Sequence, residues 1–315
     1  MVIESRLNQS QLKDYRHWKQ DVRVSASHVA LMARLLLKDR SPRRLFDNDF
    51  FPIFIGGVAG SGTTLMGALL NQNFENRLNF IGSERTKETS RLLWREKGSS
   101  FDSLDDYVAD LKSPTKNSTL RIRAAVLGLY RRSSSYPYSS PIVIDKGANS
   151  RLIRIGILRK AFPKSGNILI YRDPVEVIEG LRRKWPKLYS SQSIEELSDF
   201  WIFLHANFLK ECEFDKDLVV ISYKNLVDHS SDILESLSEK YGLSSRGEIK
   251  AYKDKSNRPG KGLRNVEEGK IKIMKNAFDS VSKTISDEEA GIIKDRTRDM
   301  LVRLNGLTSY AVPGD

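Results

Sequence analysis

A glycine-rich segment between two apolar runs contains the residues of this sequence best suited to bind an anion. Residues 56–64 read GGVAGSGTT, after the apolar run FPIFI at 51–55 and before the helix-like LMGALL at 65–70. A strand, a glycine turn and a helix start in that order direct free backbone N–H groups, at the positive end of a helix dipole, toward a phosphate. The alternative is a turn that needs glycine only for positive φ. We expect a phosphate-binding loop whose donors are Gly60, Ser61, Gly62, Thr63 and Thr64.

The loop lacks the lysine of a Walker A motif. That motif reads GxxxxGK followed by Ser or Thr, and its lysine reaches the β and γ phosphates. When Gly57 and Gly62 are aligned with the two glycines, Thr63 occupies the lysine position. A standard ATPase or kinase is therefore disfavoured.

The composition favours an anionic ligand and argues against several other classes. Lys and Arg outnumber Asp and Glu by 52 to 40, which gives a formal net charge of +12 spread along the chain. No basic block or regular basic–aromatic pattern supports specific nucleic-acid recognition. The single cysteine excludes an intrachain disulfide, and the four histidines show no metal-binding spacing, so no metal is expected. Without a secretion signal or an apolar run of about 18 residues, the expected location is the cytoplasm.

Short apolar runs alternate with helical patterns, which predicts one large α/β domain. The runs suited to buried strands are 53–57, 78–82, 142–145, 167–171 and 218–222. Such alternation is typical of a three-layer α/β/α fold around a parallel sheet of about five strands. Open sheets of this kind bind ligands beyond the carboxyl ends of their strands. The glycine loop, Glu84, Lys146 and Arg172 all follow predicted strands.

The main domain is expected at residues 48–315, with additions around it. Residues 1–47 have helical periodicity and form an N-terminal appendage, which either packs on the domain or contacts a membrane surface. Residues 95–140 are expected to form a helical insertion with a basic loop, and 244–315 a basic C-terminal segment. Within that segment the sequence SDEE at 286–289 suits the cap of a final helix.

Two further segments carry a resemblance to a known family. Residues 167–174 read NILIYRDP, a buried strand that ends in an exposed arginine, and residues 219–227 read VVISYKNLV. Together with the glycine loop, this order resembles the sulfotransferases that use 3′-phosphoadenosine-5′-phosphosulfate (PAPS). Members of that family have a PxSGTT loop, a strand ending in RDP or RNP, a later strand like RYEDL, and a P-loop-related fold. The resemblance extends over residues 51–305 and implies PAPS as donor and adenosine 3′,5′-bisphosphate (PAP) as product.

The local likeness is strongest to the tyrosylprotein sulfotransferases. They place a glutamate just after a glycine, as in Gly82-Ser83-Glu84, and a lysine and aspartate after a strand, as in Asp145-Lys146. Those enzymes are secretory and disulfide-bonded, unlike the expectation for this chain. The family also usually has Lys or Arg where Gly60 stands, and a serine eight residues after the RDP arginine, where Gly180 stands. These departures remove one cation from the sulfate and one donor from the 3′-phosphate.

The resemblance assigns roles to individual residues. The loop residues 60–64 bind the 5′-phosphate, and Arg172 clamps the 3′-phosphate with its planar fork of donors, the alternative being a strand-end salt bridge. Lys146 stabilises the leaving oxygen or is an ordinary surface lysine. Glu84 is the candidate general base or a plain helix cap.

Further assignments are weaker matches. Arg258, Lys261 and Arg264 resemble the RKG segment that closes over the donor, or form a solvated basic loop. Trp185 either stacks on adenine or is a buried core residue, and Asp145 and Tyr223 are expected to be structural.

The predicted function is transfer of a sulfuryl group to a hydroxyl or amine acceptor, which the sequence leaves open as glycan, lipid, peptide or small molecule. Two alternatives remain at this point: a P-loop kinase or nucleotide hydrolase with a displaced lysine, and a non-catalytic relative that binds a sulfated or phosphorylated partner.

Overall fold

The computed structural model describes residues 51–74, 79–81, 104–112, 142–243, 264–267, 270–273 and 284–309. The expected N-terminal appendage at residues 1–47 lies outside the described residues, as do Glu84, Arg258 and Lys261. The described part contains both sides of the glycine loop and every predicted strand.

Five parallel strands form the central sheet, and they are the five that the sequence predicts. They lie in the order β2-β3-β1-β4-β5, so that β1 is central. Every neighbouring pair is parallel, as buried apolar runs joined by helices require. The strands are β1 (Phe51–Gly56), β2 (Asn79–Ile81), β3 (Ile142–Lys146), β4 (Gly166–Tyr171) and β5 (Leu218–Ser222).

Successive strand residues alternate between two hydrophobic cores, one on each face of the sheet. Ile55, Ile168 and Ile221 belong to one core. Phe54 and Leu169, each one position away in its strand, belong to the other. Because both faces of the sheet are buried, successive residues within each strand are mostly apolar, and they do not alternate between apolar and polar types.

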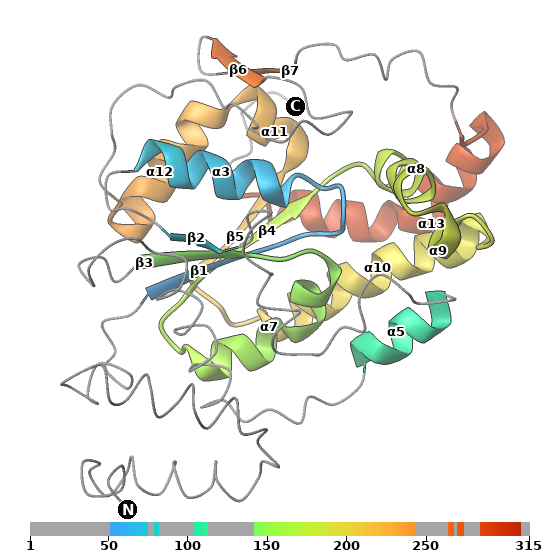
Figure 1. Ribbon diagram of the computed structural model, residues 1–315, viewed down its shortest axis with the longest axis horizontal. Coiled ribbons are helices and arrows are strands. Elements are labelled where there is room, and N and C mark those ends of the chain that lie inside the picture. The colour runs from blue at the N-terminus through green and yellow to red at the C-terminus, as the bar shows by residue number, and fades with distance from the viewer. Residues whose placement is uncertain are drawn as a thin grey trace, which may run out of the picture.

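Helices cover both faces and complete the predicted three layers (Figure 1). The core on the first face includes residues of α3 (Thr63–Asn73), α11 (Tyr223–Asp228) and α12 (Ser230–Tyr241). The opposite core is formed with α7 (Asn149–Ala161), α8 (Pro174–Lys184), α9 (Pro186–Tyr189), α10 (Ile194–Glu211) and α13 (Asp287–Gly306). Within the expected insertion, α5 (Leu104–Lys112) adds Leu104 to this second core.

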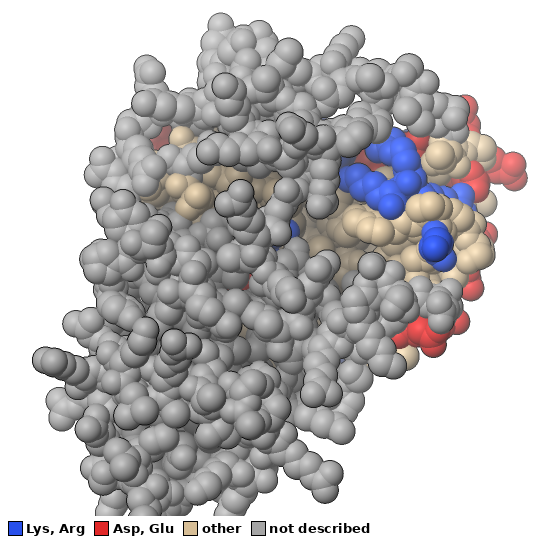
Figure 2. All heavy atoms as spheres, viewed as in Figure 1, with Lys and Arg blue, Asp and Glu red and all other residues tan. Residues whose placement is uncertain are grey.

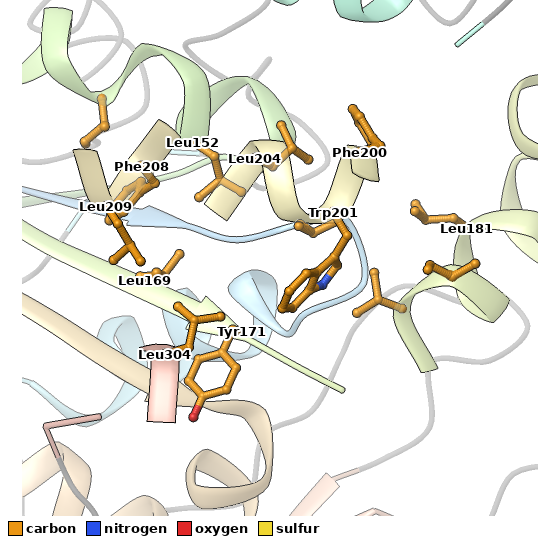
Figure 3. Packing of buried hydrophobic residues seen from close by; sticks show 14 of the residues in the cluster. Leu152, Leu169, Tyr171, Leu181, Phe200, Trp201, Leu204, Phe208, Leu209 and Leu304 are labelled. Atoms are coloured by element: carbon orange, nitrogen blue, oxygen red, sulfur yellow. The ribbon is translucent and has the colours of Figure 1, made fainter. Parts of the chain in front are cut away.

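The packing on the α10 face is built around aromatic side chains (Figure 3). Trp201 and Phe208 of α10 are fully buried beside Leu169 of β4 and Leu304 of α13. A capping box between Ser193 and Glu196 begins α10 and explains where this helix starts.

The described residues of the C-terminal segment form one helix and two strands. The predicted cap is confirmed: Ser286 and Glu289 form a capping box at the start of α13. The predicted basic segment also includes a short antiparallel hairpin of β6 (Arg264–Glu267) and β7 (Lys270–Ile273). Arg264 therefore lies in a strand, which differs from the basic loop considered for it, because alternation in 264–273 was too short to be recognised. Among the helices described here, none is long and apolar enough to cross a bilayer.

Candidate functional site

The site lies at the carboxyl ends of β1 and β4, which are neighbours in the middle of the sheet. The chain leaves β1 toward β2 on one side, whereas it leaves β4 toward β5 on the other. Connections that diverge from adjacent strands open a crevice beyond their carboxyl ends, where α/β folds bind their ligands. The glycine loop follows β1 and Arg172 follows β4, so both border this crevice.

Glycine is required in the loop by backbone conformation and by close contacts. Gly60 and Gly62 both have φ of 101°, in the left-handed region. A Cβ at Gly57 would lie 2.5 Å from the carbonyl oxygen of Ile170, and one at Gly62 would lie 2.5 Å from Cδ2 of Tyr223. The alternative of a turn that uses glycine only for positive φ therefore does not account for Gly57, which lets the loop pack directly on β4.

The backbone N–H groups of the loop fall into two sets, those that donate to a described residue and those that do not. Ser61 donates to the Val58 carbonyl at 2.9 Å, and Ala59 donates to Oδ1 of Asn149 at 2.9 Å. Among the described residues, none accepts a hydrogen bond from the N–H groups of Gly60, Gly62, Thr63 or Thr64. These groups surround the start of α3, whose first turn carries no acidic residue. A phosphate fits this donor set.

Ser61 is buried beneath the same loop. Its side chain is fully buried, and its hydroxyl has no hydrogen-bond partner within the described part of the chain. Thr63 is also buried, whereas Thr64 is exposed. A buried hydroxyl without a partner is unfavourable unless a ligand supplies one, which supports Ser61 as a ligand contact.

Arg172 stands beside the loop. One guanidinium nitrogen lies 3.5 Å from the carbonyl oxygen of Gly60, and the group stacks 4.4 Å from the ring centre of Tyr223. Arg172 also pairs with Glu176 one helical turn later. The salt bridge weighed as an alternative is thus present, although both partners are partly exposed, with side-chain exposures of 32% and 54%.

The strand-end pair Asp145 and Lys146 occupies two different environments. Asp145 is fully buried and accepts a hydrogen bond of 2.7 Å from Arg151, consistent with its expected structural role. Lys146 is 8% exposed and lies in register with Ile55, the residue that precedes Gly56. Lys146 is therefore buried, and the reading of it as an ordinary surface lysine is wrong.

Trp185 differs from its predicted environment. It is 43% exposed and ends α8, touching Tyr189 with ring centres 6.5 Å apart, so it is not a core tryptophan. Tyr223, expected to be structural, packs between Gly62 and Arg172. Gly180 has no atom within 4 Å of an added Cβ.

Sequence reasoning missed Asn149. It is the first residue of α7, three positions after Lys146, and it is 3% exposed. A polar residue just after a strand-end lysine was the available signal, but its partner lies 90 residues away. Among the described residues, no three His, Cys, Asp or Glu side chains lie close enough together to hold a metal ion.

Comparison with known families gives the decisive match. The model of the sulfotransferase family matches residues 52–246, well over half of the chain. The chain belongs to the sulfotransferase family. The matched region contains the glycine loop, Lys146 and Arg172. No curated protein matches the chain.

Solved structures similar to this sulfotransferase-family chain are distant from it. The sulfotransferase STF9 of Mycobacterium avium is 14% identical, with a TM-score of 0.48, over 67% of this chain and 68% of its own. A sulfotransferase domain from the curacin biosynthetic pathway is 17% identical, also with a TM-score of 0.48, over 84% of this chain and 99% of its own. The sulfotransferase domain of the Synechococcus PCC 7002 olefin synthase is 19% identical with a TM-score of 0.37, over 62% of this chain and 74% of that one.

Proposed function

We propose that this sulfotransferase-family protein transfers a sulfuryl group from PAPS to a hydroxyl or amine acceptor by in-line displacement. The observation that carries the proposal is the pairing of two anion sites at the crevice. The N–H groups of Gly60, Gly62, Thr63 and Thr64 form one site, and the guanidinium of Arg172 forms the other. A nucleotide with phosphates at both ends of its ribose matches two such sites.

PAPS, when bound, supplies the activated sulfuryl group, and the residues of the chain supply position and charge. The loop N–H groups and the Ser61 hydroxyl hold the 5′-phosphate, and Arg172 holds the 3′-phosphate. Lys146 stabilises negative charge on the leaving oxygen, replacing the loop cation that Gly60 lacks. Glu84 is the proposed general base, and Arg258 and Lys261 are proposed donor contacts.

The ion pair between Arg172 and Glu176 is compatible with this role. An exposed pair is held weakly, since water screens both charges. A phosphate carries more charge than a carboxylate and accepts the guanidinium fork in the same way. Arg172 can therefore exchange Glu176 for the 3′-phosphate while remaining stacked on Tyr223.

Isothermal titration with PAP tests the donor site. We expect Arg172→Ala to weaken PAP binding by roughly 10- to 100-fold, the effect of one charge-assisted contact. Arg298→Ala is the matched control, because Arg298 is an exposed arginine of α13 that pairs with Asp295 on the same helix. Binding of ATP with magnesium in the absence of PAP binding would overturn the proposal in favour of a kinase or hydrolase.

A non-catalytic binding protein is the second candidate, and Gly60 and Gly180 favour it. Because space is open around Gly180, Gly180→Ser can restore the hydroxyl that the family resemblance places there. We expect this variant to bind PAP more tightly. Transfer of labelled sulfate from PAPS to pooled acceptors by the wild-type chain supports the enzyme, whereas PAP binding without any transfer supports the binder.

Exposed basic side chains on α8 and α9, the helices that follow Arg172, favour an acceptor that carries negative charge. Arg183, Lys184 and Lys187 are exposed at the junction of α8 and α9, and Figure 2 shows Lys and Arg atoms on the side of the molecule where Figure 1 places these two helices. Cations around a site raise the local concentration of anionic ligands. Among glycan, lipid, peptide and small-molecule acceptors, we therefore propose that acidic ones are preferred.

A further inference from the structure

Asn149 joins the glycine loop to helix α9. Its Oδ1 accepts a hydrogen bond of 2.9 Å from the backbone N–H of Ala59, within the loop. Its side chain also forms a hydrogen bond with that of Tyr189, which belongs to α9 and is 3% exposed. Asn149 itself begins α7, so a single amide connects three segments of the chain.

The bond to Ala59 governs where the loop donors point. Together with the bond from Ser61 to the Val58 carbonyl, it provides acceptors for the backbone N–H groups of Ala59 and Ser61. With these two bonds fixing the loop, the N–H groups of Gly60, Gly62 and Thr63, which have no acceptor among the described residues, stay available to a ligand. Donors oriented in advance bind an anion without the cost of ordering the loop.

An asparagine is chemically suited to this position. Its amide can accept from Ala59 and donate to Tyr189 at the same time, and it carries no charge. An aspartate would place a negative charge beside the proposed phosphate site, and an alanine would leave the Ala59 N–H without a partner.

The partner Tyr189 is itself held firmly. Its ring lies 6.2 Å from that of Phe200 in the core and 6.5 Å from that of Trp185 at the surface. Burial raises the pKa of Tyr189, so its hydroxyl remains neutral and able to pair with an amide.

We propose that Asn149 is a positioning residue of the donor site, which holds the glycine loop in its phosphate-binding form and fixes it to α9 through Tyr189. This inference rests on the proposed function, because it assigns the 5′-phosphate to the loop. It concerns the loop alone and not the Arg172 side of the site.

The test compares adenosine 5′-phosphate, adenosine 3′-phosphate and PAP by titration against the full chain. We expect Asn149→Ala to weaken the binding of adenosine 5′-phosphate and of PAP roughly tenfold, the effect of one unsatisfied N–H group. The affinity for adenosine 3′-phosphate should not change. Asn149→Asp should weaken the same two ligands at least as much. Tyr189→Phe keeps the aromatic ring and the hydrogen bond between Asn149 and Ala59, so the loss of affinity for the same two ligands should be smaller, about two- to threefold.

Asn207→Ala provides the matched control. Asn207 also binds α7, donating to the carbonyls of Leu152 and Ile153 at 2.9 and 3.1 Å, but it has no hydrogen bond to the loop. Asn207→Ala should lower the melting temperature without changing the ratio of the affinities for adenosine 5′-phosphate and adenosine 3′-phosphate. If Asn149→Ala weakens the two monophosphates equally, or neither, while the wild type binds PAP, the inference is wrong. A wild-type chain that binds none of the three ligands overturns the proposed function and this inference with it.

Discussion

Three glycines, Gly60, Gly62 and Gly180, differ in what their positions require. Gly62 has positive φ and lies against Tyr223. Gly60 has the same φ of 101° with open space around it. Gly180 lies inside α8 with ordinary helical φ and no neighbour within 4 Å of an added Cβ. One substitution, Gly to Ala, therefore separates conformational strain from steric contact.

We expect the free energy of unfolding to change in graded steps across these three alanine variants. Gly60→Ala should cost about 1 kcal/mol for the left-handed backbone, and Gly62→Ala about 2–4 kcal/mol, since the contact with Tyr223 adds to the strain. Gly180→Ala should stabilise by about 0.5–1 kcal/mol, as alanine does in a helix interior. Urea denaturation measures all three. Equal costs at Gly60 and Gly62 would show that Tyr223 moves aside freely.

At the scale of one element, α10 contains a titratable group that does not belong to the proposed site. His205 is fully buried, with Nδ1 2.8 Å from the Trp201 carbonyl oxygen and its ring 4.1 Å from that of Trp201. Burial lowers the pKa of His205 to about 4, against the opposing effect of the carbonyl. The helix is therefore built around a neutral histidine.

The stability of the chain should decrease as the pH falls from about 6.5 toward 4. In this range the unfolded chain binds a proton at His205, whereas the folded chain does not. The stabilisation that comes from the neutral His205 is therefore complete above pH 6.5 and is lost progressively as the pH falls toward 4. The expected slope is about 1.4 kcal/mol per pH unit. His205→Gln should have a shallower slope in denaturant titrations at pH 5–6.5. An identical slope in the variant would show that other groups cause the acid loss.

At the scale of the whole molecule, one sheet unites two cores. Leu204 of α10 is fully buried in the core on one face, and Leu237 of α12 is fully buried in the core on the other. Every residue of β4 is buried, and residues of β1, β4 and β5 belong to both cores. Loss of either core should therefore expose strands that the other core needs.

We expect Leu204→Ala and Leu237→Ala each to lower the free energy of unfolding by about 2–5 kcal/mol. Unfolding should remain a single cooperative transition in both variants. Far-UV circular dichroism and tryptophan fluorescence should report the same midpoint, although Trp201 lies in only one core. Val302→Ala is the control, because Val302 is 66% exposed and should change the stability by less than about 0.5 kcal/mol. Two separate transitions in either core variant would contradict this coupling.

Local patterns in the sequence were sufficient for the elements and for the outline of the site. The five strands follow from apolar runs, and the start of α13 follows from the capping box at Ser286 and Glu289. The glycine loop and the strand-end position of Arg172 were predicted for the same reason. Each depends on residues within a few positions of one another, whose preferences act wherever the segment lies.

Only the tertiary structure decided how these segments meet. The contact of Asn149 with Ala59 joins residues 90 positions apart, and Arg172 reaches Gly60 across 112 positions. The burial of Lys146, the exposure of Trp185 and the placement of Tyr223 beneath Arg172 likewise depend on strand order and helix packing. Such contacts leave no local pattern, because the two partners lie far apart in the sequence and meet only when the sheet and its helices assemble. The chemistry of the site was therefore predictable by residue type, whereas its internal connections required the fold.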